Sequence, residues 1–185
     1  MIRAILIHGN GNSKPTDNWL PYLKRELEKI GIKVEAPQFP DTELARSSYW
    51  LPFLEKLKAD ENTIIVGHSS GAIAAMRYAE THRILGSALI GAYYTDLGIE
   101  AEKRSGYFDT PWNWEAIKQN QRWIIQFAGA NDPWIPIREA HVIRDQLQTD
   151  YYESPDQGHF GGDYYKETFS ELLEAIKRKA EKSAI

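Results

Sequence analysis

The feature that most constrains this chain is a Gly-x-Ser-x-Gly motif at residues 67–71, set between a strand pattern and a helix pattern. A β-branched run over residues 63–66 precedes the motif, and an Ala-rich run over residues 72–76 follows it. In a strand–turn–helix context this motif forms a nucleophile elbow, a turn too sharp for side chains on both flanks. We therefore predict that the two glycines let strand and helix approach closely. Ser69 is then expected to adopt a strained backbone conformation at the end of a sheet.

Composition narrows the class of protein. The chain has 185 residues, 42% of them hydrophobic, and we find no repeat or linker, which predicts one domain over residues 1–185. Lys and Arg number 22 against 26 Asp and Glu, a balance that argues against nucleic acid as the main partner because phosphate binding needs a concentrated positive face. The absence of cysteine excludes disulfides, thiolate nucleophiles and thiolate zinc sites.

Membrane and export segments are not expected. No apolar run reaches the ~20 residues that span a bilayer, and the first residues lack the layout of a signal peptide. We expect a cytoplasmic protein without a membrane partner.

Short apolar runs alternate along the chain with longer amphipathic ones. Strands are predicted over residues 2–7, 32–36, 63–66, 84–90, 122–127 and 150–153. Helices are predicted over residues 19–30, 43–58 (bent or restarted near Pro52), 70–80, 114–119, 141–147 and 164–181. This alternation predicts an α/β fold with a six-stranded, mostly parallel sheet and helices on both faces.

The long connection over residues 91–114 breaks this rhythm and is rich in aromatic residues. Connections of this length are uncommon in compact domains and are often functional. Its aromatic side chains, Tyr93 and Tyr94 among them, either line an apolar pocket or form ordinary core, because both favour the same residue types. The sequence leaves open whether the segment acts as a lid.

A nucleophilic serine needs a base, and the base needs an acid that orients it. Asp132 lies in a turn-rich stretch after the fifth predicted strand, and His159 lies in a Gly-flanked loop after the sixth. The order Ser69, Asp132, His159 is the order of α/β-hydrolases, and the carboxyl ends of parallel strands share one edge. We predict that the three side chains converge there. Asp156, beside His159 in sequence, is expected to be a turn residue.

An oxyanion hole is expected beside the serine. The backbone N–H of Ser70, at the start of a helix, is one predicted donor, and that of Asn10, in the Gly-rich loop after the first strand, is the other. A phosphate-binding role for that loop is disfavoured, because it matches neither the Gly-x-Gly-x-x-Gly nor the Gly-x-x-x-x-Gly-Lys spacing.

Motifs spread over essentially the whole chain carry a resemblance to one family. They lie at residues 50–53, 63–83, 105–108, 111–112, 126–127, 132–133 and 158–160. In these motifs the chain resembles the retinoblastoma-binding protein 9 family of small serine hydrolases. The resemblance implies a compact α/β-hydrolase fold without a large lid domain, and it places nucleophile, acid and base at Ser69, Asp132 and His159.

The resemblance also bears on partners. The family is named for a Leu-x-Cys-x-Glu peptide that binds the retinoblastoma protein, and the equivalent run here, residues 57–61, has Ala59 in place of the cysteine. That replacement argues against the interaction for this chain, while the hydrolase site is unaffected.

The sequence therefore predicts a serine hydrolase that cleaves a small ester or amide through an acyl-enzyme and needs no metal or organic cofactor. Aromatic residues near the loops are expected to form the substrate pocket: Tyr93, Tyr94, Trp134 and Phe160. The alternative is a binding module with little or no turnover on a hydrolase scaffold, since function resides in sites and not in folds.

Overall fold

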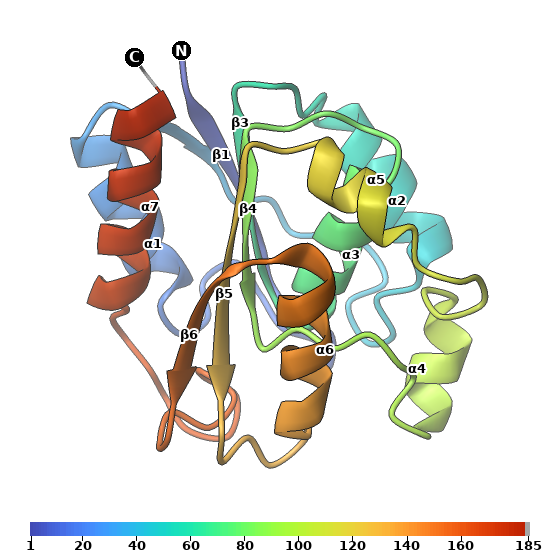
Figure 1. Cartoon of the computed structure of the whole chain (residues 1–185). Coiled ribbons are helices and arrows are strands. Elements are labelled where there is room, and N and C mark those ends of the chain that lie inside the picture. Colours follow the sequence, from blue (N-terminus) through green and yellow to red (C-terminus); the bar gives the residue numbers. More distant parts are fainter. Residues whose placement is uncertain (184–185) are drawn as a thin grey trace.

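A parallel sheet of six strands forms the centre of the computed structural model, which describes residues 1–183 (Figure 1). The strands are β1 Arg3–Ile7, β2 Lys33–Glu35, β3 Thr63–His68, β4 Gly86–Ile90, β5 Trp123–Gly129 and β6 Asp150–Ser154. Their order is β2-β1-β3-β4-β5-β6, and every neighbouring pair is parallel. The strand order reverses between β1 and β3, and open α/β sheets bind ligands at the carboxyl ends beside such a switch point.

Helices cover both faces of the sheet (Figure 1), which confirms the predicted α/β fold. On one face lie α1 (Leu20–Lys29) and α7 (Ser170–Ser183). On the other lie α2 (Ser47–Lys56), α3 (Ser70–Ala79), α5 (Trp114–Gln119) and α6 (Ile137–Leu147). The short helix α4 (Glu100–Ser105) lies at the end of the molecule where β5 and β6 finish. No helix within residues 1–183 is long and apolar enough to cross a bilayer.

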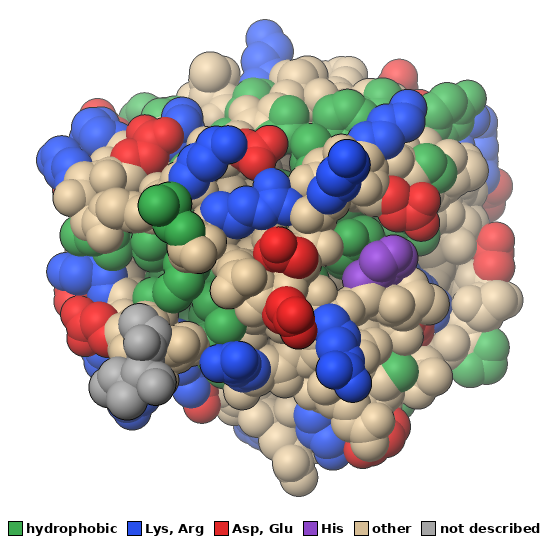
Figure 2. All heavy atoms as spheres, turned by 90° about the horizontal axis from the view of Figure 1, so that it is seen from above, with side chains coloured by type: hydrophobic (Ala, Val, Ile, Leu, Met, Phe, Trp, Pro, Cys, Tyr) green, Lys and Arg blue, Asp and Glu red, His purple; other side chains and the backbone are tan. Residues whose placement is uncertain are grey.

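Charged side chains of both signs are mixed on the opposite end, where β1 begins (Figure 2). The basic groups there are interspersed with Asp and Glu rather than gathered into a continuous positive face.

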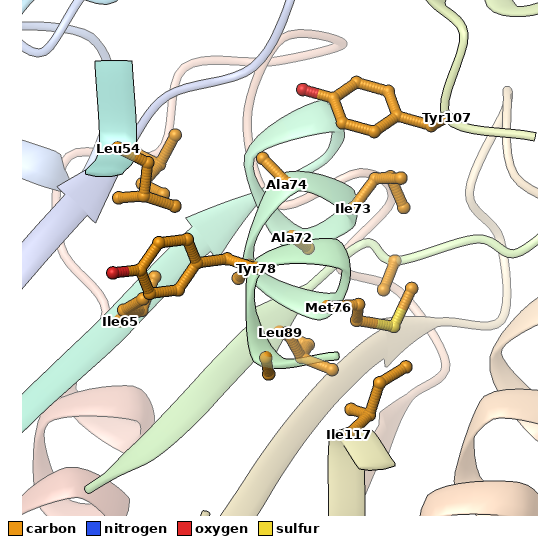
Figure 3. Packing of buried hydrophobic residues seen from close by; sticks show 14 of the residues in the cluster. Leu54, Ile65, Ala72, Ile73, Ala74, Met76, Tyr78, Leu89, Tyr107 and Ile117 are labelled. Atoms are coloured by element: carbon orange, nitrogen blue, oxygen red, sulfur yellow. The ribbon is translucent and has the colours of Figure 1, made fainter. Parts of the chain in front are cut away.

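Successive residues of β1 point into two separate cores, as the period of a strand requires. Ile5 and Ile7 join the core beneath α3, and Ala4 and Leu6 join the core beneath α1 and α7. Every residue of α3 is buried, because the sheet packs on one side of this helix and α2 and α5 on the other (Figure 3). Its small alanine side chains let the helix lie close to the strand that precedes it.

Three departures from the predicted elements have a cause that the structure shows. Helix α2 starts at Ser47, because Ala45, inside the predicted range 43–58, has a positive φ of 52° that a right-handed α-helix does not accommodate. Helix α7 starts at Ser170 because the segment before it is tied down elsewhere: the N–H of Lys166 donates to the side chain of Asn18. Helix α4 lies inside the long connection, where no helix was predicted before residue 114, and its polar sequence has no helical apolar stripe.

Candidate active site

Ser69 lies at the turn between β3 and α3 in the strained conformation predicted for it, with φ 55° and ψ −121°. A Cβ atom on Gly67 would lie 2.3 Å from the carbonyl carbon of Gly71, and one on Gly71 would lie 2.5 Å from the carbonyl oxygen of Ile7. Both distances are shorter than van der Waals contact with backbone. The glycines are therefore required for strand, turn and helix to approach this closely.

His159 and Asp132 meet after β6 and β5, and each side chain is almost fully buried. The Nδ1 atom of His159 lies 2.6 Å from Oδ2 of Asp132. Because an ionised carboxylate only accepts hydrogen bonds, Nδ1 carries the proton and donates it. Among residues 1–183, Nε2 of the same ring makes no hydrogen bond, so it is the basic atom of the pair.

The carboxylate of Asp132 is fixed by backbone donors as well as by the imidazole. Its Oδ1 accepts hydrogen bonds from the N–H groups of Trp134, at 2.9 Å, and Ile135, at 3.0 Å. Burial acts to raise the pKa of Asp132, but the hydrogen bond and charge of His159, together with these N–H groups, outweigh it and hold the pKa below its ordinary value. Asp132 is therefore ionised at neutral pH.

The ring of His159 has little freedom to move. A Cβ atom on Gly91, whose φ is +60°, would lie 2.9 Å from Cε1 of that ring. The Trp134 ring meets it edge-on with centroids 5.0 Å apart, and the His68 ring lies 4.9 Å away. The sequence did not predict that Gly91 makes room for this ring, because a glycine after a strand is usually an ordinary turn residue.

His68 and His8 form hydrogen bonds with backbone groups. Histidines close to a site more often have this role than that of a base. Nε2–H of His68 donates to the carbonyl oxygen of His159 at 2.7 Å. Burial, followed by the nearby charge of His159, lowers the pKa of His68 to about 3, so it stays neutral. His8 donates from Nδ1 to Gly9 O and accepts at Nε2 from the N–H of Phe39, and burial lowers its pKa too.

A cavity of about 380 Å³ opens between these loops at the carboxyl ends of the strands. Ser69, His159 and Asn10 all line it, together with apolar side chains. The apolar part of the wall consists of Trp19, Leu20, Tyr93, Leu97, Ile99, Trp134 and Ile135. Its size falls within the range of small-molecule sites.

Two of the four residues predicted to form the substrate pocket lie in its wall, and two do not. Tyr93 and Trp134 line the cavity. Phe160 was wrongly placed: a φ of 55° turns its side chain into the core beneath α7, where it stacks on Phe169 with centroids 5.2 Å apart. Tyr94 was also wrongly placed, since its ring packs on the core beneath α3 and meets Trp114 edge-on.

Helix α4 and the loop before it supply three wall residues that sequence reasoning missed: Leu97, Ile99 and Glu102. The unusual length of the connection was the one indication that it contributes to a site. The other aromatic residues of the connection belong to the core beneath α3 or pack against it: Tyr107, Phe108, Trp112 and Trp114. Arg77 anchors this part by donating to the carbonyl oxygens of Tyr107 and Thr110.

Of the two residues predicted to form the oxyanion hole, one shares the cavity wall with Ser69 and the other follows Ser69 directly in the chain. Asn10 is in the cavity wall, and Ser70 is the first residue of α3. N–H groups in the first turn of a helix lack partners within that helix. Asp156, the competing acid, accepts a hydrogen bond from Ser154 as a turn residue does. Within residues 1–183, no cluster of His, Asp and Glu has the geometry of a metal site.

Comparison with known families gives a match over most of the chain. The model of a family described as serine hydrolase matches residues 4–177. Serine hydrolase RBBP9 of Rattus norvegicus is 46% identical over 178 residues, which cover 95% of this chain and 94% of the relative. Putative hydrolase YdeN of Bacillus subtilis is 26% identical over 167 residues, with 85% of each chain covered.

Solved structures agree on the fold. The crystal structure of the ydeN gene product of B. subtilis superposes with a TM-score of 0.89 at 21% identity, covering 97% of this chain and 98% of that one. Est1E of Butyrivibrio proteoclasticus, solved with ferulic acid bound, superposes with a TM-score of 0.71 at 14% identity, covering 100% of this chain and 88% of that one. Both are α/β structures of similar extent, so no large extra domain is indicated here.

Proposed function

The chain belongs to the serine hydrolase family, as its resemblance to the retinoblastoma-binding protein 9 family predicted, and we propose that it cleaves a small ester or amide through an acyl-enzyme formed on Ser69. One observation carries the proposal. A single cavity is lined by a serine in a strained elbow and by a histidine whose Nδ1 is held 2.6 Å from a buried carboxylate. A strained turn and a buried carboxylate both cost stability, and a binding module gains nothing from either.

The proposed reaction starts with proton transfer. Nε2 of His159 takes the proton of the Ser69 hydroxyl as Oγ attacks the substrate carbonyl carbon, and Asp132 stabilises the imidazolium that forms. The backbone N–H groups of Asn10 and Ser70 donate to the oxyanion of the tetrahedral intermediate. Collapse of that intermediate breaks the bond to the leaving group, which receives the proton from His159. Water then attacks the acyl-enzyme by the same route and restores Ser69.

The cavity supports a small substrate with an apolar acyl group. Leu97, Ile99 and Ile135 offer aliphatic contact near Ser69, and Trp134 adds an aromatic edge. The balance of 22 Lys and Arg against 26 Asp and Glu fits a small-molecule substrate better than nucleic acid.

Two further expectations remain predictions. One is a cytoplasmic location. The other is that the retinoblastoma protein is not a partner, because Ala59 replaces the motif cysteine. In support of the second, Leu57 and Ala59 pack against the core beneath α3, so this segment is not presented as a free peptide.

Labelling with a fluorophosphonate probe, together with turnover of short-chain nitrophenyl esters, tests the proposal. We expect the wild type to label and turn over, and Ser69→Ala to do neither. Ser170→Ala, which removes an exposed hydroxyl at the start of α7, serves as a control and should behave as wild type. Labelling that persists in Ser69→Ala would eliminate the assigned nucleophile. A wild type that neither labels nor turns over would favour the binding module.

A further inference from the structure

Glu102 joins both residues of the proposed oxyanion hole through one buried network. Its Oε1 accepts a hydrogen bond from Nδ2 of Asn10 at 2.9 Å, and its Oε2 accepts one from the Tyr93 hydroxyl at 2.8 Å. The same hydroxyl lies 3.3 Å from Oγ of Ser70. Glu102, Tyr93 and Ser70 are 8%, 1% and 2% exposed, so water hardly competes for these hydrogen bonds.

The network connects side chains from four segments that are far apart in the sequence. Asn10 follows β1, Ser70 begins α3, Tyr93 follows β4, and Glu102 lies on α4. An oxyanion hole made of two N–H groups stabilises charge only if both point at one spot, and a small displacement of either weakens it. Glu102 links the side chain of Asn10, in the loop after β1, to that of Ser70, at the start of α3, through the Tyr93 hydroxyl.

The burial of Glu102 is otherwise unexplained. Within the described part of the chain, no Lys, Arg or His nitrogen lies within 4.0 Å of its carboxylate in an ion pair. Burial raises the pKa of Glu102, so the fold holds this group at a cost in stability. Its charge would also oppose a developing oxyanion nearby. What the side chain does supply is two acceptor oxygens at a fixed spacing, each already used.

We propose that Glu102 is a positioning residue, which holds Asn10 directly and Ser70 through Tyr93 so that their backbone N–H groups converge on the substrate oxyanion. The inference rests on the proposed function of Ser69. It assigns a role to helix α4, whose other residues show no hydrogen bond to the site among residues 1–183.

Two substitutions of Glu102 distinguish the effect of its hydrogen bonds from the effect of its negative charge. In Glu102→Gln, the amide oxygen accepts from Asn10 and the amide nitrogen donates to the Tyr93 oxygen, whose own proton turns to Ser70. The network therefore survives without the charge. Glu102→Leu keeps a similar volume but removes both acceptors. We expect kcat of Glu102→Gln within about threefold of wild type, and kcat of Glu102→Leu lowered about 10- to 100-fold with KM unchanged, since the donors are misplaced and not removed.

The inhibition constant of a boronic acid reports on the oxyanion hole specifically. A general loosening of the fold would not change it in proportion to kcat/KM. The Ser69 oxygen adds to the trigonal boron, its proton passes to His159, and the tetrahedral adduct places a boron-bound oxygen in the oxyanion hole. We expect the inhibition constant to rise in Glu102→Leu by the factor by which kcat/KM falls, and to stay near wild type in Glu102→Gln. Glu100→Leu, an exposed change on the same helix, is the matched control.

The outcomes are distinct from those that test Ser69. If the wild type turns over esters and Glu102→Leu keeps wild-type kcat and boronate affinity, the positioning role is wrong while the hydrolase assignment stands. Equal losses in Glu102→Gln and Glu102→Leu would also overturn it, because charge would then be the active property. Should Glu102→Leu not fold, Tyr93→Phe cuts only the link to Ser70, and unchanged boronate affinity in that variant would contradict the proposal.

Discussion

His159 and Asp132, which are 27 positions apart in the sequence, lie with Nδ1 and Oδ2 separated by 2.6 Å. Their side chains are 5% and 3% exposed, so this hydrogen bond is shielded from water. The other carboxylate oxygen of Asp132 is occupied by two backbone N–H groups. Asp132 therefore has one oxygen to anchor it and one to orient the imidazole, which makes its substitution by asparagine informative.

Asp132→Asn should lower kcat by about 10³- to 10⁴-fold. The amide oxygen can keep the hydrogen bonds from Trp134 and Ile135, and the amide nitrogen then faces Nδ1 of His159. A donor at that position forces the proton of the ring onto Nε2, which can no longer take the proton of Ser69. Steady-state kinetics with a nitrophenyl ester measure the loss. Asp156→Asn, on the same loop as His159, should stay within a few-fold of wild type, and a loss below tenfold in Asp132→Asn would contradict the assigned role.

Gly91→Ala should lower kcat/KM by about tenfold or more while the protein still folds, since the new methyl group would displace the ring of His159. Its backbone strain also costs about 1 kcal/mol of stability. Gly31→Ala separates the two effects. That glycine, at φ +82°, has open space around it and lies at the end of α1, away from the cavity, so the strain arises without the displacement. Equal activity in the two variants, compared at equal folded fraction, would show that Gly91 does not set the position of the ring.

Trp134→Ala and Phe160→Ala should have different effects, because Trp134 lies in the cavity wall and Phe160 lies in the core. Trp134 is 50% exposed and lines the cavity, so its loss is expected to raise KM for aryl esters about 3- to 10-fold with little change in stability. Phe160 is 1% exposed and stacked on Phe169, so its loss should cost about 3–5 kcal/mol of unfolding free energy and leave KM unchanged. Chemical denaturation and kinetics on both variants provide the check. A change in substrate preference in Phe160→Ala would show that Phe160 does contribute to the substrate pocket.

Glu102→Gln should become more stable than wild type as the pH rises. Burial raises the pKa of Glu102 in the folded protein above its ordinary value of 4.5. The folded state then binds more protons than the unfolded state, so the wild type loses stability as the pH rises from that ordinary value through the raised one. Glutamine does not titrate. The difference in unfolding free energy, measured by urea denaturation between pH ~4 and ~8, should therefore grow with pH in favour of the variant. A difference that does not change with pH would contradict the effect of burial.

The sequence predicted the fold because its evidence is local and repeated. Alternating apolar runs and amphipathic runs indicate a parallel sheet between helices, and the structure confirms this down to the short helix over residues 114–119. The predicted start of α2 was wrong because Ala45, with its positive φ, interrupts an otherwise helical pattern.

The sequence by itself determined the elbow at Ser69 and the chain order of Ser69, Asp132 and His159. Both are local patterns: a pair of glycines at a fixed spacing, and polar residues that directly follow predicted parallel strands. Only the tertiary structure decided that Tyr93, although part of the core beneath α3, also reaches the cavity wall while Tyr94 and Phe160 do not, and that Glu102 meets Asn10 across 92 positions of sequence. The reason is that aromatic and acidic residues have the same local propensities in either setting. Which neighbour they meet depends on how segments distant in the chain pack together.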